Sequence, residues 1–295
     1  MKLRFIVLVL AMLILSQPVY SHDNKDIEEK RDKFRIETDG SVRAGAFRFN
    51  SIADYVRSDY FKRNGKRCGT REMYFSRTRQ LYRSTEDCTT SKTTIRNEYW
   101  PDQVLSLPVP VVFHVITKTD GSGNVTDQQI HDQIQVLNED FGAIVGTMGA
   151  NGFDTKIRFM LAGITRSSND SWFNDENQSA YKQALAWNTT KYLNVYTNSA
   201  SGNLGYAYYP QDMAGQMLDG IVLLYTTVGG RNNGAHDGLY DQGRTLVHEV
   251  GHYFGLLHTF EGGCGDGYEA GDLIADTNTE EIDHYSCVQT NTCGT

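Results

Sequence analysis

Residues 248–258 read HEVGHYFGLLH, and this stretch decides the fold prediction. Side chains four residues apart lie on one face of a helix, so His248 and His252 can point at one ion. Glu249 stands beside them, within reach of a water on that ion. Gly255 tolerates backbone angles that other residues resist, so the helix can end there and return His258 as a third ligand. Three imidazoles with an open fourth position are typical of a catalytic zinc site.

The composition makes a chance occurrence of this motif negligible. With 8 His and 28 Gly in 295 residues, the full pattern arises by accident in roughly 0.00003 of such chains. Zinc lowers the pKa of a bound water to about 7. We expect Glu249 to take a proton from that water and to pass it to the leaving amine. The motif thus predicts peptide-bond hydrolysis by a metal-activated water, although a non-peptide amide substrate stays open.

The start of the chain has the pattern of a secretory signal. Lys2 and Arg4 precede an apolar run over 5–15, and small residues then favour cleavage after Ser21. The run is too short to span a bilayer, so a removed signal peptide over 1–21 is preferred to a retained anchor. We therefore expect a secreted protein in an oxidising compartment, with no membrane attachment after signal removal.

Charge divides the remainder into two parts. Residues 22–96 carry 18 Lys and Arg against 12 Asp and Glu, whereas residues 97–295 carry 8 against 24. The net charge of −8 argues against a nucleic-acid partner. The apolar pattern of 22–96 is short and broken, which leaves two alternatives. It is a solvated basic arm or, as we prefer, a prosegment that docks on the acidic part through complementary charge. Arg96, at the boundary, is one candidate activation site.

Residues 97–295 have the pattern of one folded domain. Thr126 opens a helix as half of a capping box with Gln129, and apolar residues then recur at helical spacing to Phe141. A second, short helix is expected over 179–187. Strands are expected over 108–118, 156–166, 191–197 and 219–228. Strands that alternate with helices predict an α/β (α+β) fold with a mixed sheet.

From about residue 109 to 293 the chain resembles the pappalysin family of metzincin zinc metalloproteases. Beside the zinc motif, the resemblance is carried by VVFHV at 111–115, LNEDF at 137–141, LGYA at 204–207, GRTLV at 243–247 and HTFEGGC at 258–264. It implies a zincin-like fold with a mixed twisted sheet, a backing helix and an active-site helix. It also implies a secreted endopeptidase made as a zymogen, inhibited by its own prosegment. Protein or peptide substrates would lie antiparallel to an edge strand.

One feature departs from the family pattern. Metzincins need a Met-containing turn downstream of the third histidine, whereas the last methionine here is Met217. We therefore expect a chain truncated before the Met turn, with an incomplete C-terminal subdomain. The alternative function is a catalytically inactive zinc-binding or peptide-binding fragment.

The five cysteines carry further predictions. The resemblance implies a disulfide between Cys264 and Cys293, which leaves Cys287 without a partner in this sequence. Cys68 lies in KRCGT at 66–70, which is similar to the inhibitory segment of metzincin prosegments. By that resemblance its thiolate occupies the open zinc position and keeps the zymogen silent. A disulfide to Cys88 and a free thiol are the alternatives.

Acidic residues cluster after Cys264, at Asp266, Glu269, Asp272 and Asp276. Hard oxygen ligands at this density suit calcium, and the resemblance implies calcium near this stretch. Asp272 and Thr277 are the preferred ligands. The alternative is an acidic surface loop.

Overall fold

The computed structural model describes residues 34–64, 67–70, 105–230, 239–265, 269–274, 277–284, 288 and 290–294. The predicted signal peptide, Arg96, Cys88, Cys287 and the two aspartates at 266 and 276 lie outside the described residues. The chain divides into two units, 1–32 and 33–295, and every element below belongs to the second. No helix in the described part of the chain is long and apolar enough to cross a membrane.

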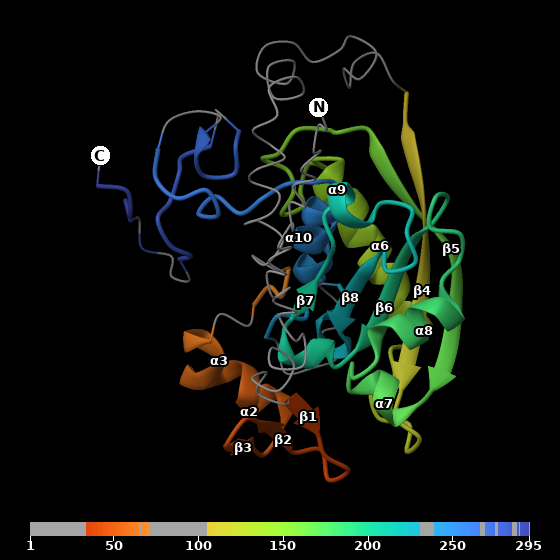
Figure 1. Cartoon of the computed structure of the whole chain (residues 1–295). Coiled ribbons are helices and arrows are strands. Elements are labelled where there is room, and N and C mark those ends of the chain that lie inside the picture. Colours follow the sequence, from red (N-terminus) through yellow and green to blue (C-terminus); the bar gives the residue numbers. More distant parts are fainter. Residues whose placement is uncertain are drawn as a thin grey trace, which may run out of the picture. The chain divides into compact units, whose positions relative to one another are not determined.

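A five-stranded mixed sheet in the order β5-β4-β6-β8-β7 forms the frame (Figure 1). Its strands are β4 (Leu107–Thr117), β5 (Ile157–Ser168), β6 (Leu193–Asn198), β7 (Gly205–Tyr206) and β8 (Ile221–Leu224). All neighbours are parallel except β7, which runs antiparallel to β8 at the edge. β6 and β8 are buried along their full length, and β8 is accordingly wholly apolar in sequence. The mixed-sheet prediction is confirmed.

Helices cover both faces of this sheet (Figure 1). One face packs against α6 (Asp127–Phe141), which begins with the expected capping box, and against α10 (Arg244–Tyr253). The other packs against α7 (Asp170–Phe173) and α8 (Gln178–Leu185). The strand expected over 219–228 is shorter, because the 3₁₀ turn η5 (Tyr225–Thr227) follows β8 directly. A second 3₁₀ turn, η4 (Ala200–Gly202), and α9 (Pro210–Met213) flank the edge strand β7.

Residues 34–63, which we call the N-terminal module, form a small folded unit. Strands β1 (Phe34–Ile36), β2 (Val42–Ala44) and β3 (Phe47–Phe49) make an antiparallel sheet. Helices α2 (Ile52–Arg57) and α3 (Asp59–Arg63) follow, each capped by a serine hydroxyl. The solvated-arm alternative is therefore wrong for these residues.

The N-terminal module shares a core with the face of the main sheet that α7 and α8 also cover. Its Tyr55 and Phe61 are buried in one cluster with Tyr196 and Val222 of the sheet, and Tyr55 donates a hydrogen bond to the Gly202 carbonyl at 2.9 Å. Each such buried side chain contributes about 1.5–3 kcal/mol. An exposed ion pair such as Arg35–Glu176, at the margin of this contact, contributes at most about 1 kcal/mol. The docking thus depends mainly on apolar burial, not on the charge complementarity that the composition suggested.

Candidate metal centre

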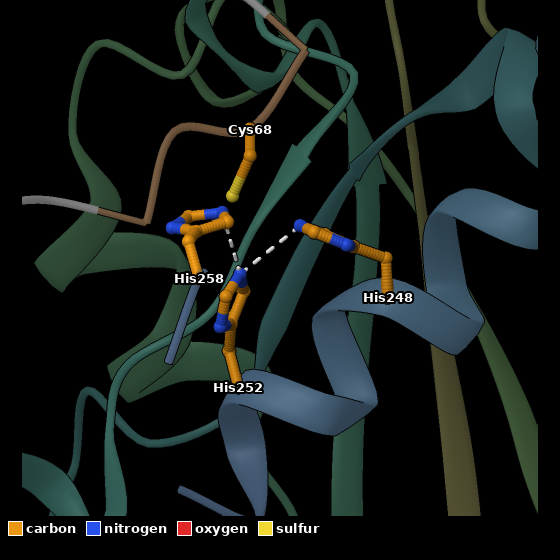
Figure 2. A group of neighbouring side chains, drawn as sticks. All are labelled: Cys68, His248, His252 and His258. Atoms are coloured by element: carbon orange, nitrogen blue, oxygen red, sulfur yellow. Dashed lines mark hydrogen bonds between the residues drawn. The ribbon is translucent and has the colours of Figure 1, made fainter. Parts of the chain in front are cut away.

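Three histidine rings converge at the C-terminal end of α10 (Figure 2). His248 and His252 project from one face of the helix, and His258 comes from the segment after it. The Nε2 atom of His252 lies 3.0 Å from that of His248 and 3.1 Å from that of His258. All three rings therefore present the same nitrogen to one point, as the motif spacing predicted.

The end of α10 explains how His258 returns to the helix. The Leu256 N–H bonds to the Gly251 carbonyl, and the Gly255 N–H bonds to the His252 carbonyl, which is the Schellman pattern of helix termination. Gly255 has φ +96°, a conformation that strains any residue with a side chain. The chain consequently reverses there and brings His258 back.

Hydrogen bonds to the distal ring nitrogens hold two of the rings. The Nδ1 atom of His252 lies 2.7 Å from the Leu256 carbonyl, and that of His258 lies 3.0 Å from Glu261 Oε2. Glu261 Oε2 also accepts hydrogen bonds from the His258 N–H and from the Tyr209 hydroxyl. Burial opposes ionisation of Glu261, but these bonds outweigh it and lower its pKa. Such outer contacts orient the Nε2 atoms toward a shared ligand.

Burial also determines the charge state of the two helix rings. It lowers the pKa of His248 to about 4 and that of His252 to about 3, with a smaller contribution from the neighbouring rings. Both are therefore neutral at pH 7, which is the form that binds metal.

The fourth group at this point is the Cys68 thiol, which follows the N-terminal module in the chain. The Cys68 sulfur and the three ring nitrogens all lie within 4.8 Å of one another. Cys68 is free in the structure, whereas Cys88, its alternative partner, lies outside the described residues. Burial, followed by the charge of Glu249, raises the pKa of the Cys68 thiol well above its usual range.

Glu249 is fully buried and faces the same point. Its Oε2 atom lies 3.8 Å from the Cys68 sulfur and accepts a hydrogen bond from the Thr70 hydroxyl at 3.0 Å. Its Oε1 atom is buried without a hydrogen-bond partner in the described part of the chain. Burial raises the pKa of Glu249 to about 8, against the hydrogen bonds from Thr70 and Cys68, which lower it.

Residues 68–70 are held by the edge strand of the main sheet. The Gly69 N–H donates to the Gly205 carbonyl at 2.8 Å, and the Ala207 N–H donates to the Thr70 hydroxyl at 2.9 Å. Gly205 also lets this edge lie close to α10, because a Cβ atom there would lie 3.0 Å from the side chains of Glu249 and Thr245. The edge of β7 thus fixes the segment that carries Cys68.

This donor set fits zinc. Ligands about 2.0–2.3 Å from a tetrahedral zinc ion stand roughly 3.3–3.7 Å apart. The ring nitrogens here are slightly closer, at 3.0 and 3.1 Å, and the whole group lies within 4.8 Å. One thiol and three imidazoles are the ligand types that zinc prefers. The Glu249 Oε1 atom, buried without a partner in the described residues, is an acceptor for a further polar ligand.

The other predicted residues lie on the segment after His258. Cys264 and Cys293 form a disulfide, the pairing that the resemblance implied. The Thr277 hydroxyl donates to Asp272 Oδ1 at 2.5 Å, so the two proposed calcium ligands are adjacent. Calcium binding there stays a prediction, since hydrogen bonds within the pair account for this contact.

Sequence reasoning missed Thr70 and Glu261. Glu261 lies three residues after His258, a spacing that a search for partners of the third ring would have singled out. No local pattern marks Thr70, because its partners Glu249 and Ala207 are more than 130 positions away.

Comparison with known proteins agrees with this geometry. The family model described as Pregnancy-associated plasma protein-A (peptidase M43) matches residues 163–295. An extracellular metalloprotease of Colletotrichum graminicola is 36% identical over 189 residues, which cover 62% of this chain and 61% of that relative. The chain thus spans about three fifths of the length of this curated relative.

Two solved structures from Tannerella forsythia are also similar. Mature mirolysin in complex with a cleaved peptide is 35% identical, with 60% of this chain and 73% of that chain covered and a TM-score of 0.48. A promirolysin mutant is 29% identical, with 72% of this chain and 76% of that chain covered and a TM-score of 0.50. Residues 163–295 therefore match the peptidase M43 (pappalysin) family, and the curated relatives of the chain are extracellular metalloproteases.

Proposed function

We propose that the protein is a secreted, zinc-dependent endopeptidase that is made as a latent precursor. The observation that carries this proposal is the convergence of His248, His252 and His258 on one point that Glu249 also faces. The extracellular relatives and the match of residues 163–295 to the peptidase M43 family support it. Substrates would be proteins or peptides, as the complex of mature mirolysin with a cleaved peptide suggests.

Glu249 would supply the proton transfers of the reaction. When bound, a zinc ion would polarise a water and the scissile carbonyl. Glu249 would accept a proton from the attacking water and return it to the amine that leaves, which is general acid–base catalysis by one carboxylate. The open edge of β7 would hold the substrate backbone through Gly205 and Ala207, the groups that hold residues 68–70 here.

Latency would come from residues 22–96 acting as a prosegment. The Cys68 thiol would fill the ligand position that a water needs, and Thr70 would occupy Glu249. The N-terminal module would keep both in place by its buried contact with the main sheet. Removal of the prosegment would then free the metal centre and the base together.

The test is a metal-replete assay of the proteolytically activated chain. Zinc analysis should give one ion per molecule, and cleavage of casein or a fluorogenic peptide should stop on chelation. Glu249→Gln should retain the zinc yet lose activity by about 10²–10⁴-fold, because only the base is removed. Full activity in Glu249→Gln would exclude the proposed base. Bound zinc without cleavage by the unaltered chain would favour a zinc-binding or peptide-binding protein.

A further inference from the structure

The edge strand β7 presents different groups on its two sides. Gly205 and Ala207 offer backbone atoms to residues 69 and 70, and a Cβ atom at Gly205 would point toward Glu249. Successive side chains of a strand point to opposite faces, so Tyr206 and Tyr208 point away from the metal centre. Whatever holds Tyr206 therefore sets the position of the edge without touching the site.

Tyr206 is held by Asp175, in the loop between α7 and α8. Asp175 Oδ2 accepts hydrogen bonds from the hydroxyls of Tyr206 and Ser201, each at 2.8 Å. Its Oδ1 atom accepts one from the Tyr181 hydroxyl, also at 2.8 Å. Gln178 in α8 donates to the Tyr206 hydroxyl at 2.8 Å and accepts from that of Tyr208 at 2.5 Å. Burial raises the pKa of Asp175, while these hydroxyl donors lower it.

The backbone conformation of Asp175 allows a substitution that changes its hydrogen bonds but not its backbone. It has φ +59°, in the left-handed region that disfavours most side chains. Asp and Asn are several-fold enriched in that region, so Asp175→Asn keeps the backbone preference and the shape. The substitution replaces one accepting oxygen by a donor that faces hydroxyl donors. It therefore changes the hydrogen bonding at this position with little effect on the loop.

We propose that Asp175 is a positioning residue, which fixes β7 through Tyr206 and so aligns the Gly205 and Ala207 backbone groups that hold a chain in the cleft. This inference rests on the proposed function for its substrate, whereas its effect on residues 68–70 does not need activity. Small misplacements of a bound substrate cost up to about 10²-fold in rate. We expect a smaller loss of rate from changing Asp175, because the hydrogen bonds Tyr181–Asp175, Gln178–Tyr206 and Tyr208–Gln178 remain.

The first experiment uses the full chain after proteolytic activation. Asp175→Asn should raise KM for a peptide substrate about tenfold, with kcat within about threefold and zinc content unchanged. Tyr206→Phe should reproduce this effect, and the double variant should lose clearly less than the sum of the two single effects, since both remove the Tyr206–Asp175 hydrogen bond. Glu176→Gln is the matched control, because it removes the exposed Arg35 pair from the same loop. A loss of folded protein with an unchanged KM would overturn the positioning role.

The second experiment needs no catalysis. In the chelator-treated full chain, Cys68 should be alkylated about tenfold faster in Asp175→Asn, because a looser β7 edge opens residues 68–70 more often. Glu176→Gln should stay within twofold of the unaltered chain, with each rate measured on the Cys68 peptide by mass spectrometry. Equal rates in Asp175→Asn and the unaltered chain would overturn the inference. Faster alkylation in Asp175→Asn, together with no peptide cleavage by the activated unaltered chain, would contradict the proposed function but support the positioning role of Asp175.

Discussion

At the scale of single residues, the Thr70 hydroxyl links three parts of the structure. It donates to Glu249 Oε2, accepts from the Ala207 N–H and lies two residues after Cys68. A buried carboxylate that loses such a donor is destabilised, since it has no water to replace the bond. In the proposed precursor, Thr70 would therefore block the proposed base while Cys68 would block the metal position.

Thr70→Val in the full chain should shorten the lag before peptidase activity appears by about fivefold. Valine has a similar shape but no hydroxyl, so both hydrogen bonds are lost, at about 1 kcal/mol each. Time courses with a fluorogenic peptide would measure the lag. Thr70→Ser keeps the hydroxyl and should restore it. An equal lag in Thr70→Val and the unaltered chain would show that Cys68 alone maintains latency.

Lys182 gives a pH-dependent prediction away from the metal centre. Its side chain is fully buried, with Nζ 2.7 Å from the Leu218 carbonyl and 4.9 Å from the Tyr208 ring. Burial lowers its pKa to about 7, although the charges of Asp175 and Asp219 oppose this. Between pH 7 and 10.5 the unfolded chain binds a proton that the folded chain lacks. The contribution of Lys182 to the free energy of unfolding therefore rises with pH in that window.

Lys182→Met should increase the free energy of unfolding at pH 6 by on the order of 2 kcal/mol, because it removes a buried charge. The advantage should shrink as the pH is raised to 9. Urea unfolding at several pH values would measure both effects. Lys191→Met, at an exposed position, is the control and should change little. A Lys182→Met protein less stable than the unaltered chain at pH 6 would contradict the assigned cost of burial.

At the scale of elements, the end of α10 matters most, because it decides whether His258 reaches the other two rings. The helix itself follows from sequence, since its apolar residues face β8 and α6 at regular spacing. The helix ends just before Gly255, which is the residue of this turn that adopts a positive φ.

Gly255→Ala should destabilise the fold by about 1–2 kcal/mol, the cost of a left-handed conformation with a Cβ atom. It should also weaken zinc binding about tenfold or more, because His258 shifts. Calorimetric titration with zinc would measure the affinity. Gly251→Ala is the matched control: its Cβ atom would meet only ordinary contacts, and alanine favours a helix interior. Equal zinc affinities in the two variants would argue against a role for the turn.

Local patterns predicted the long elements well and the short ones poorly. The strand over 108–118 and the helix from Thr126 correspond to β4 and α6, whose apolar periodicity and capping box are local signals. β7 has two residues and no periodicity, so nothing in the sequence distinguishes it from a loop. Its pairing with β8 and its hydrogen bonds to residues 69 and 70 define it instead.

At the scale of the whole molecule, the N-terminal module is followed closely in the chain by Cys68, which lies at the metal centre. The module is buried against the sheet face opposite α10, while Cys68 reaches the histidines on that helix. Phe61 and Tyr55 anchor the module through buried contacts with the main sheet, and neither belongs to the ligand group of the metal centre. Docking and blocking can therefore be separated by substitution.

Phe61→Ala should undock the module, because truncating a buried Phe costs about 3–5 kcal/mol. Hydrogen exchange should then speed up across β1–β3, with β4 and β6 unchanged as internal references. Phe47→Ala is the control, since this side chain is 55% exposed on the same module. Unchanged protection of β1–β3 in Phe61→Ala would indicate that the contact with the main sheet contributes little.

The sequence by itself determined the zinc motif, the family resemblance and the main βα succession, because these depend on residues close together in the chain. Spacing alone puts His248 and His252 on one helix face, and Gly255 predicts the turn that leads to His258. Only the tertiary structure decided that Thr70 meets Glu249, that Asp175 holds Tyr206, and that the N-terminal module is folded. The reason is physical: these contacts join residues far apart in the chain. The module's apolar residues complete a core only when the main sheet supplies the other half.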